Sequence, residues 1–213
     1  MTEASNTIVV QSSVPIIGIV GGVGSGKSTL ARWVAEHHPA VVMDADRIGH
    51  ALLGDAAVKT ALRAEFGGDI FDTDGNVIRS SLAQKVFGTS PEQQAGRQRL
   101  DALLHPLIRQ EIHRHVASVD PQRIRVVLLD AALLLESGWR DQCRAVVFID
   151  TPLERREQWV RTNRGWTVEE LQRREASQWP LERKRAAADV VIPNDGDVAT
   201  AAADLWNGIQ RVL

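Results

Sequence analysis

The stretch Gly21-Gly22-Val23-Gly24-Ser25-Gly26-Lys27-Ser28-Thr29 fits the phosphate-loop pattern G-x-x-x-x-G-K-[ST]. The apolar run Ile16-Ile17-Gly18-Ile19-Val20 precedes it and predicts a buried strand, and apolar residues at helical spacing follow it. In such a strand–loop–helix unit, backbone N–H groups and the helix dipole face bound phosphate. We therefore expect the residues from Gly22 to Thr29 to bind a nucleotide. The Lys27 ammonium would reach the terminal phosphates, and the Ser28 hydroxyl would ligate Mg²⁺.

The composition is that of an ordinary globular domain. Of 213 residues, 44% are hydrophobic and 24% are charged, and the formal net charge is -2. This charge argues against a nonspecific nucleic-acid binder, which would carry an excess of basic residues. Cys143 is the only cysteine, so no intramolecular disulfide can form. Without a recognisable signal peptide or membrane-spanning run, we expect a cytoplasmic protein with a loose extension over residues 1–13.

Five uninterrupted apolar runs predict buried strands. After the run before the phosphate loop they are Ala40–Met43, Val126–Leu129, Ala145–Ile149 and Val190–Ile192. Helical patterns lie between these runs, so the predicted class is α/β, with a parallel sheet covered on both faces.

Local signals also predict where helices begin and end. Capping-box patterns begin at Ser90, Thr151 and Thr167, and each predicts a helix start. Proline disfavours helix at the preceding residue, so His105-Pro106 predicts a helix break.

Carboxylates follow three of the predicted strands. Asp44 and Asp46 come after the second strand, Asp130 after the third and Asp150 after the fourth. Ligands of an open parallel sheet bind outside the carboxyl ends of its strands. Carboxylates there can hold Mg²⁺, directly or through water, or accept a proton from an attacking hydroxyl. We expect a functional role for Asp46 and only a helix-cap or turn role for Asp150, with Asp44 and Asp130 as alternative metal contacts.

The segment from Arg155 to Arg185 is strongly basic. It carries nine arginines and lysines against five glutamates, a local excess of +4. Arginines of a mobile lid can stabilise the charge of a transferring phosphoryl group while the lid excludes water. We expect this role for Arg161 and Arg164, which share a helix face at i, i+3 spacing. A solvated helix face is expected for three other arginines, namely Arg156, Arg173 and Arg183.

Taken together, these motifs resemble those of the dephospho-coenzyme A kinases, in order along nearly the whole chain from Ile16. Beside the phosphate loop, the matching stretches are D-A-D-R-I-G-H from Asp44, L-H-P-L-I from Leu104, L-L-L-E-S-G from Leu133, R-T-N-R from Arg161, R-E-A-S-Q from Arg174 and R-K-R-A-A-A-D-V-V-I-P-N-D-G from Arg183. The chain departs from the family at Ala132, where proline usually precedes the two leucines, whereas Glu136 of that motif is kept.

The resemblance implies a P-loop NTPase fold of the adenylate-kinase-like type, with a five-stranded parallel sheet flanked by helices. A single kinase unit over residues 14–213 would comprise three parts. These are a nucleotide core (about 14–45, 121–154 and 186–213), a helical substrate domain (about 46–120) and a lid (about 155–185).

The implied reaction moves the γ-phosphoryl group of MgATP to the ribose 3′-hydroxyl of dephospho-CoA. By resemblance, Asp46 is the base, and Lys27, Arg161 and Arg164 stabilise the moving group. Asn194 lies in the loop that should approach adenine. The implied substrate contacts are Asp46, His50, His105, Arg164 and Gln178. The partners would be ATP and dephospho-CoA, without nucleic acid or membrane, and the protein would be a monomer or weak homo-oligomer.

Three alternatives stay open on sequence alone. The first is another P-loop small-metabolite kinase, of the nucleoside or shikimate type. The second is a GTPase-like switch, which needs an N-K-x-D stretch, but Asn194-Asp195-Gly196-Asp197 lacks the lysine. The third is a scaffold that has lost catalysis, against which the intact Lys27, Ser28 and Asp46 argue.

Overall fold

A computed structural model describes residues 14–88 and 90–213, so the predicted extension over residues 1–13 lies outside the described residues. The chain packs into two compact units. Among the described residues, one unit comprises residues 14–44 together with His113–Leu213, and the other comprises residues between Ala45 and Ile112. Across the described ranges, no helix is both long and apolar enough to cross a membrane.

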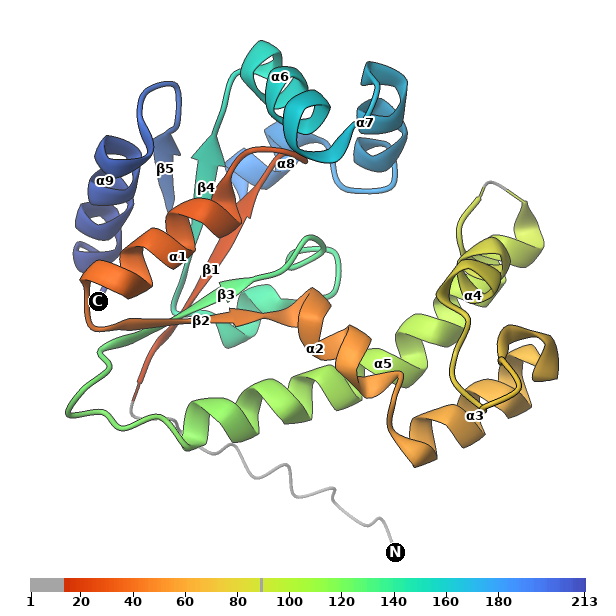
Figure 1. Cartoon of the computed structure of the whole chain (residues 1–213). Coiled ribbons are helices and arrows are strands. Elements are labelled where there is room, and N and C mark those ends of the chain that lie inside the picture. Colours follow the sequence, from red (N-terminus) through yellow and green to blue (C-terminus); the bar gives the residue numbers. More distant parts are fainter. Residues whose placement is uncertain (1–13, 89) are drawn as a thin grey trace, which may run out of the picture. The chain divides into compact units, whose positions relative to one another are not determined.

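The first unit is built on a five-stranded parallel sheet of order β2-β3-β1-β4-β5 (Figure 1). The strands are β1 (Ile16–Gly21), β2 (Ala40–Asp44), β3 (Val126–Asp130), β4 (Ala145–Asp150) and β5 (Val190–Pro193). The predicted strands and the α/β class are therefore confirmed. Strand β1, which leads into the phosphate loop, is central and pairs with β3 on one side and β4 on the other.

Helices cover the sheet because successive side chains of each strand point to opposite faces. Helices α1 (Lys27–His37) and α9 (Val198–Gln210) lie side by side on one face (Figure 1). Ile17 and Ile19 of β1 belong to the apolar core on that face. Gly18 points the other way, where a Cβ would lie 2.8 Å from Leu134 Cδ1. Strand β1 is thus buried on both faces, as its unbroken apolar run predicts.

The first unit also contains α6 (Leu153–Arg164), α7 (Val168–Glu175), α8 (Leu181–Ala186) and the 3-10 helix η2 (Trp139–Gln142). The capping box at Thr167 is confirmed, because its side chain accepts a hydrogen bond from the Glu170 N–H at 3.3 Å. The one at Thr151 is wrong. Pro152 is the N-cap of α6, without a side-chain cap bond, and the Thr151 hydroxyl donates to the Ser25 carbonyl instead. Asp150 does not cap α6 either, because the start of that helix has no side-chain cap bond, and the Asp150 carboxylate pairs with Arg185.

The second unit is helical, with α2 (Ala45–Leu52), α3 (Ala56–Phe66), η1 (Gly68–Ile70), α4 (Arg79–Val86) and most of α5 (Pro91–Ala117). Its core gathers side chains from α3, η1 and α4, among them Leu62, Ile70 and Leu82. The capping box at Ser90 is confirmed, because the Gln93 N–H donates to Ser90 Oγ at 3.2 Å.

The predicted helix break at His105-Pro106 is wrong, because α5 continues through Pro106. A proline inside a helix removes one backbone hydrogen bond and costs about 3 kcal/mol. Leucines on either side of it, namely Leu100, Leu103, Leu104 and Leu107, pack against the core of the second unit. We infer that this tertiary packing outweighs the local cost of the proline.

Candidate active site

The phosphate loop adopts the strand–loop–helix geometry that its sequence predicts. It leaves β1 at Gly21 and enters α1 at Lys27, and Gly24 (φ 77°) and Gly26 (φ 79°) take left-handed conformations. Inside the loop, the Ser25 N–H donates to the Gly22 carbonyl at 3.1 Å. Glycine adopts this backbone without the penalty that a Cβ would impose, so the two glycines shape the loop.

The start of α1 is open to an anion. Among the residues that the structure describes, no side chain caps α1, and its first turn holds no acidic residue. Asp55, Thr167 and Asp197 cap α3, α7 and α9, whereas α4, α6 and α8 also begin without a side-chain cap. The first N–H groups of a helix lack intrahelical partners, and the helix dipole adds positive potential there. The beginning of α1 therefore presents donors and positive potential to phosphate.

Lys27 points to the carboxyl edge of the sheet. Its Nζ lies 3.3 Å from Oδ1 of the buried Asp130, which ends β3. Asp44, which ends β2, is the register partner of Asp130 on the neighbouring strand. Lys27, Ser28 and the two carboxylates thus belong to the same end of the first unit.

This donor set fits Mg²⁺. Magnesium prefers oxygen ligands and is usually held by one or two carboxylates together with substrate phosphates and water. Within the described residues, no group of three or more histidine, cysteine, aspartate or glutamate side chains could hold a metal by itself. A sparse oxygen set of this kind suits an ion that arrives with nucleotide phosphates.

Two side chains, those of Thr151 and Asn194, form hydrogen bonds with the backbone of the phosphate loop. The Ser25 carbonyl accepts hydrogen bonds from Thr151 Oγ1 and from Asn194 Nδ2, each at 2.8 Å. Thr151 follows β4 and Asn194 follows β5, and all three residues are buried. The structure thus engages the Asn194 amide with the loop, and the predicted approach of Asn194 to adenine stays a prediction.

The expectation that Arg156 lies on a solvated helix face is wrong. The residue is 4% exposed rather than part of a solvated face. Its Nε donates to the Thr151 carbonyl at 3.2 Å, and its guanidinium forms an ion pair with Glu175 of α7. Arg173 and Arg183 both keep the expected exposure. Arg173 pairs with Glu170, and the Arg183 guanidinium carbon lies 3.3 Å from the ring centroid of Trp179. The burial of Arg156 could not be predicted from the sequence, because helical spacing alone does not show which face of α6 contacts the phosphate loop.

The predicted lid arginines Arg161 and Arg164 lie in the last turn of α6, which ends at Gly165 (φ 64°). The Arg164 guanidinium carbon lies 4.6 Å from the ring centroid of Trp166, and that of Arg174 lies 4.0 Å from the same ring. Partial burial, and then the neighbouring Arg174 charge, lower the pKa of Arg164.

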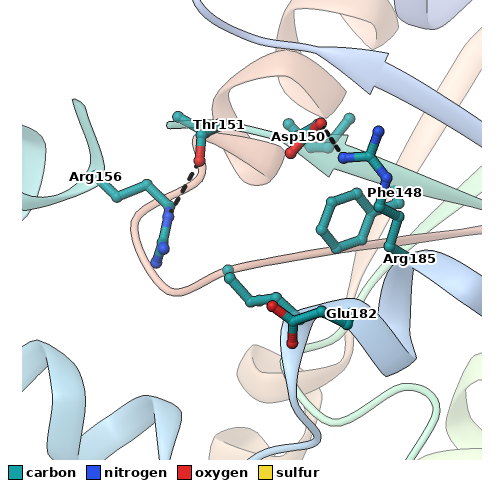
Figure 2. A pocket seen from close by; sticks show the side chains of 9 residues that line it. Phe148, Asp150, Thr151, Arg156, Glu182 and Arg185 are labelled. Carbon is teal, nitrogen blue, oxygen red and sulfur yellow. Dashed lines mark hydrogen bonds and ion pairs between the residues drawn. The ribbon is translucent and has the colours of Figure 1, made fainter. Parts of the chain in front are cut away.

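A small pocket of about 230 Å³ opens beside Gly22 at the end of β4 (Figure 2). Figure 2 shows Phe148 on its wall, with Asp150 and Arg185 paired beside it. Arg156, which also lines it, is paired with Glu175. Both arginines that line this pocket therefore have carboxylate partners, as Lys27 does.

Gln178 belongs to a buried network around Lys184. The Lys184 Nζ donates to Gln178 Oε1 at 2.8 Å and to the Ala132 carbonyl at 3.3 Å, and lies 3.1 Å from Glu136 Oε1. Burial lowers the pKa of Lys184, and the Glu136 charge opposes that shift. Proline would offer the same carbonyl at position 132, so alanine there keeps this contact.

The remaining predicted residues lie in the second unit. Asp46 is in the first turn of α2 and is exposed. His50 lies in the last turn of that helix, and its Nε2 lies 2.9 Å from an Arg79 guanidinium nitrogen. His105 Nε2 on α5 lies 3.6 Å from Asp101 Oδ1. The roles assigned to these three residues stay predictions.

Comparison with known proteins decides the family. The model of the family described as dephospho-CoA kinase matches residues 15–200 of this chain. The chain belongs to the dephospho-CoA kinase family. A dephospho-CoA kinase of Rhodopirellula baltica is 41% identical over 184 residues, which cover 86% of this chain and 84% of that protein. One from Corynebacterium diphtheriae is 36% identical over 195 residues, which cover 90% of this chain and 95% of that protein.

Solved structures agree on the fold. TT1252 from Thermus thermophilus matches with a TM-score of 0.81 at 28% identity, covering 94% of this chain and 98% of its own. A dephospho-CoA kinase from Campylobacter jejuni matches with a TM-score of 0.55 at 19% identity, covering 93% of this chain and 97% of its own, and shows the fold alone. Family membership favours the predicted activity over the alternatives: the chain is an ATP-dependent kinase that phosphorylates dephospho-CoA to CoA.

Proposed function

We propose that the chain transfers the γ-phosphoryl group of ATP to the ribose 3′-hydroxyl of dephospho-CoA, with Mg²⁺ bound beside the phosphate loop. The observation that carries the donor side is the uncapped start of α1 next to the Lys27–Asp130 pair. A positive, preorganised set of donors supports binding of a triphosphate at this point.

On the donor side, N–H groups of the loop and of the first turn of α1 would bind the phosphates, except those of Val23 and Ser25, which donate to Glu175 and to the Gly22 carbonyl. The Lys27 ammonium would exchange Asp130 for the terminal phosphates, where it stabilises charge as it develops. Ser28, with Asp44 or Asp130 through water, would hold Mg²⁺, which when bound neutralises charge on the phosphate oxygens.

On the acceptor side, Asp46 would orient the 3′-hydroxyl and accept its proton. Two trans peptide units keep the Cα of Asp46 within about 7.6 Å of the Cα of Asp44. The hydroxyl oxygen would form a bond to the γ-phosphorus while the bond to the β–γ bridging oxygen breaks. The electron pair of that bond would leave with ADP, and the proton would pass to the Asp46 carboxylate.

The lid would complete the site with Arg161 and Arg164, which stabilise the equatorial oxygens of the moving group. Further contacts to dephospho-CoA are proposed for His50, His105 and Gln178. Asn194 would border adenine through the loop after β5, and the protein would act as a monomer or weak homo-oligomer.

The test offers the purified protein MgATP with dephospho-CoA, adenosine, shikimate or gluconate and measures ADP release. Phosphorus NMR of the product then locates the new phosphate on the ribose. Of the four acceptors, we expect only dephospho-CoA to give rapid ADP release, and we expect its product to carry a 3′-phosphate. Release at background level with dephospho-CoA, or a phosphate at another position, would contradict the proposal.

A further inference from the structure

Two helices of the predicted lid form hydrogen bonds with Val23 of the phosphate loop. The Val23 N–H donates to Glu175 Oε1 on α7 at 3.1 Å. The Val23 carbonyl accepts from an Arg156 guanidinium N–H on α6 at 3.4 Å. Arg156 and Glu175 also form an ion pair with each other. Both polar groups of one residue in the loop therefore contact one ion pair, which we name the Val23 clamp (Arg156 and Glu175).

Close packing brings α6 to this point. A Cβ at Gly22 would lie 2.8 Å from an Arg156 guanidinium nitrogen, and one at Gly24 would lie 2.7 Å from Val160 Cγ1. Real Cβ atoms do not approach other atoms this closely. Gly22 and Gly24 therefore let α6 rest directly against the loop, in addition to shaping it.

The clamp is buried enough to matter energetically. The exposed fractions are 5% for the Arg156 side chain and 23% for that of Glu175, whereas the Arg173 side chain of the nearby Arg173–Glu170 pair is 77% exposed. Exposed ion pairs contribute little, but removing one partner of a buried pair leaves an uncompensated charge. The two pairs lie in the same lid segment, and Arg173 is the exposed member of the second pair, so Arg173 serves as the control position.

We propose that Arg156 and Glu175 are positioning residues that couple the lid to the phosphate loop. Arg161 and Arg164 follow Arg156 on the same helix, and Glu175 is the last residue of α7. Holding the Val23 peptide from both helices places the lid arginines and the phosphate-binding loop in one arrangement. This coupling rests on the proposed function, in which the lid arginines act on the phosphoryl group that the loop presents.

The experiment compares Glu175→Gln with Arg173→Gln. Binding of the fluorescent analogue mant-ATP is measured without dephospho-CoA, and kcat and KM are measured with both substrates. We expect Glu175→Gln to weaken mant-ATP binding about tenfold and to lower kcat, leaving KM for dephospho-CoA within twofold. Arg173→Gln should change each quantity less than twofold. The apolar double variant Arg156→Met/Glu175→Met leaves no buried charge unpaired and keeps the test open if Glu175→Gln folds poorly.

A second experiment distinguishes an effect on the coupling between the lid and the phosphate loop from an effect on protein stability alone. Glu175→Gln combined with Arg164→Ala should lower kcat by less than the product of the single effects, because both changes act through the lid. A folded Glu175→Gln or double-methionine variant with wild-type nucleotide affinity and kcat would overturn the proposal, even with a lowered melting temperature. If the wild type fails to phosphorylate dephospho-CoA, the proposed function fails, but the mant-ATP arm still decides the clamp.

Discussion

The grip on the Ser25 carbonyl can be tested with the variants Thr151→Val, Asn194→Ala and their combination. Ser25 accepts two hydrogen bonds of 2.8 Å, and its carbonyl is buried among these partners. A buried hydrogen bond contributes about 1 kcal/mol net, whereas a buried carbonyl without any partner costs about 1–3 kcal/mol. Each single variant leaves Ser25 one partner, and the double variant leaves it none.

We therefore expect Thr151→Val to lower the free energy of unfolding by about 1 kcal/mol. Asn194→Ala should lower it by about 2 kcal/mol, since it also removes side-chain packing. The double variant should exceed the sum of these losses by about 1–2 kcal/mol, because only then is the carbonyl orphaned.

The same variants should weaken nucleotide binding. In a planar trans peptide, the Ser25 carbonyl and the Gly26 N–H point in opposite directions. Holding the carbonyl on the outer side of the loop therefore holds the Gly26 N–H toward its phosphate-binding side. Each 1.4 kcal/mol lost from this preorganisation would weaken ATP binding about tenfold.

Urea unfolding measures the free energies, and calorimetric titration measures ATP affinity. Thr200→Val is the control, because it removes a hydroxyl whose hydrogen bond to Asp197 is exposed. Additive losses in the double variant, together with ATP affinity within twofold of wild type, would refute the reasoning.

Three further predictions concern the acceptor, the lid and the buried thiol. Asp46→Asn should lower kcat at least a hundredfold while leaving ATP affinity within about twofold, as general-base removal does; near-full turnover in steady-state assays would reject Asp46 as the base. Arg164→Ala should lower kcat more than it weakens dephospho-CoA binding, and initial-rate kinetics showing a pure affinity loss would make it a binding residue. Burial raises the pKa of the Cys143 thiol from its ordinary 9.0 to about 12. The native state then binds more protons than the unfolded state above pH 9, so the free energy of unfolding should fall by about 1.4 kcal/mol per pH unit from this group between pH 9 and 12. Comparing urea unfolding of wild type and Cys143→Ala at pH 8.5 and 10.5 checks this slope, and equal slopes in both proteins would contradict it.

Prediction from sequence worked where the signal is local. The five strands were predicted because each is an unbroken apolar run, and a buried parallel sheet requires such runs. The phosphate loop was predicted because its pattern G-x-x-x-x-G-K-[ST] lies within nine consecutive residues, and the structure shows that Gly26 of that pattern has a left-handed backbone, which glycine adopts readily. The capping boxes at Ser90 and Thr167 formed because their partners lie three residues away.

Prediction failed where a contact with residues distant in sequence overrides the local pattern. Thr151 matched a capping box, but the Ser25 carbonyl, 126 residues away in sequence, takes its hydroxyl. Pro106 matched a helix breaker, but leucines on both sides of it pack into the core of the second unit.

The chain's own pattern was thus enough for the fold class, the nucleotide loop and the family motifs, since these depend on residues close together in sequence. Only folding decided which side chains hold that loop. Arg156 and Asn194 come to it from α6 and from the end of β5, because parallel strands deliver their carboxyl ends to one edge of the sheet. Burial then changes what these residues do, since a polar group removed from water must find a partner, and here the partners are the backbone groups of the phosphate loop.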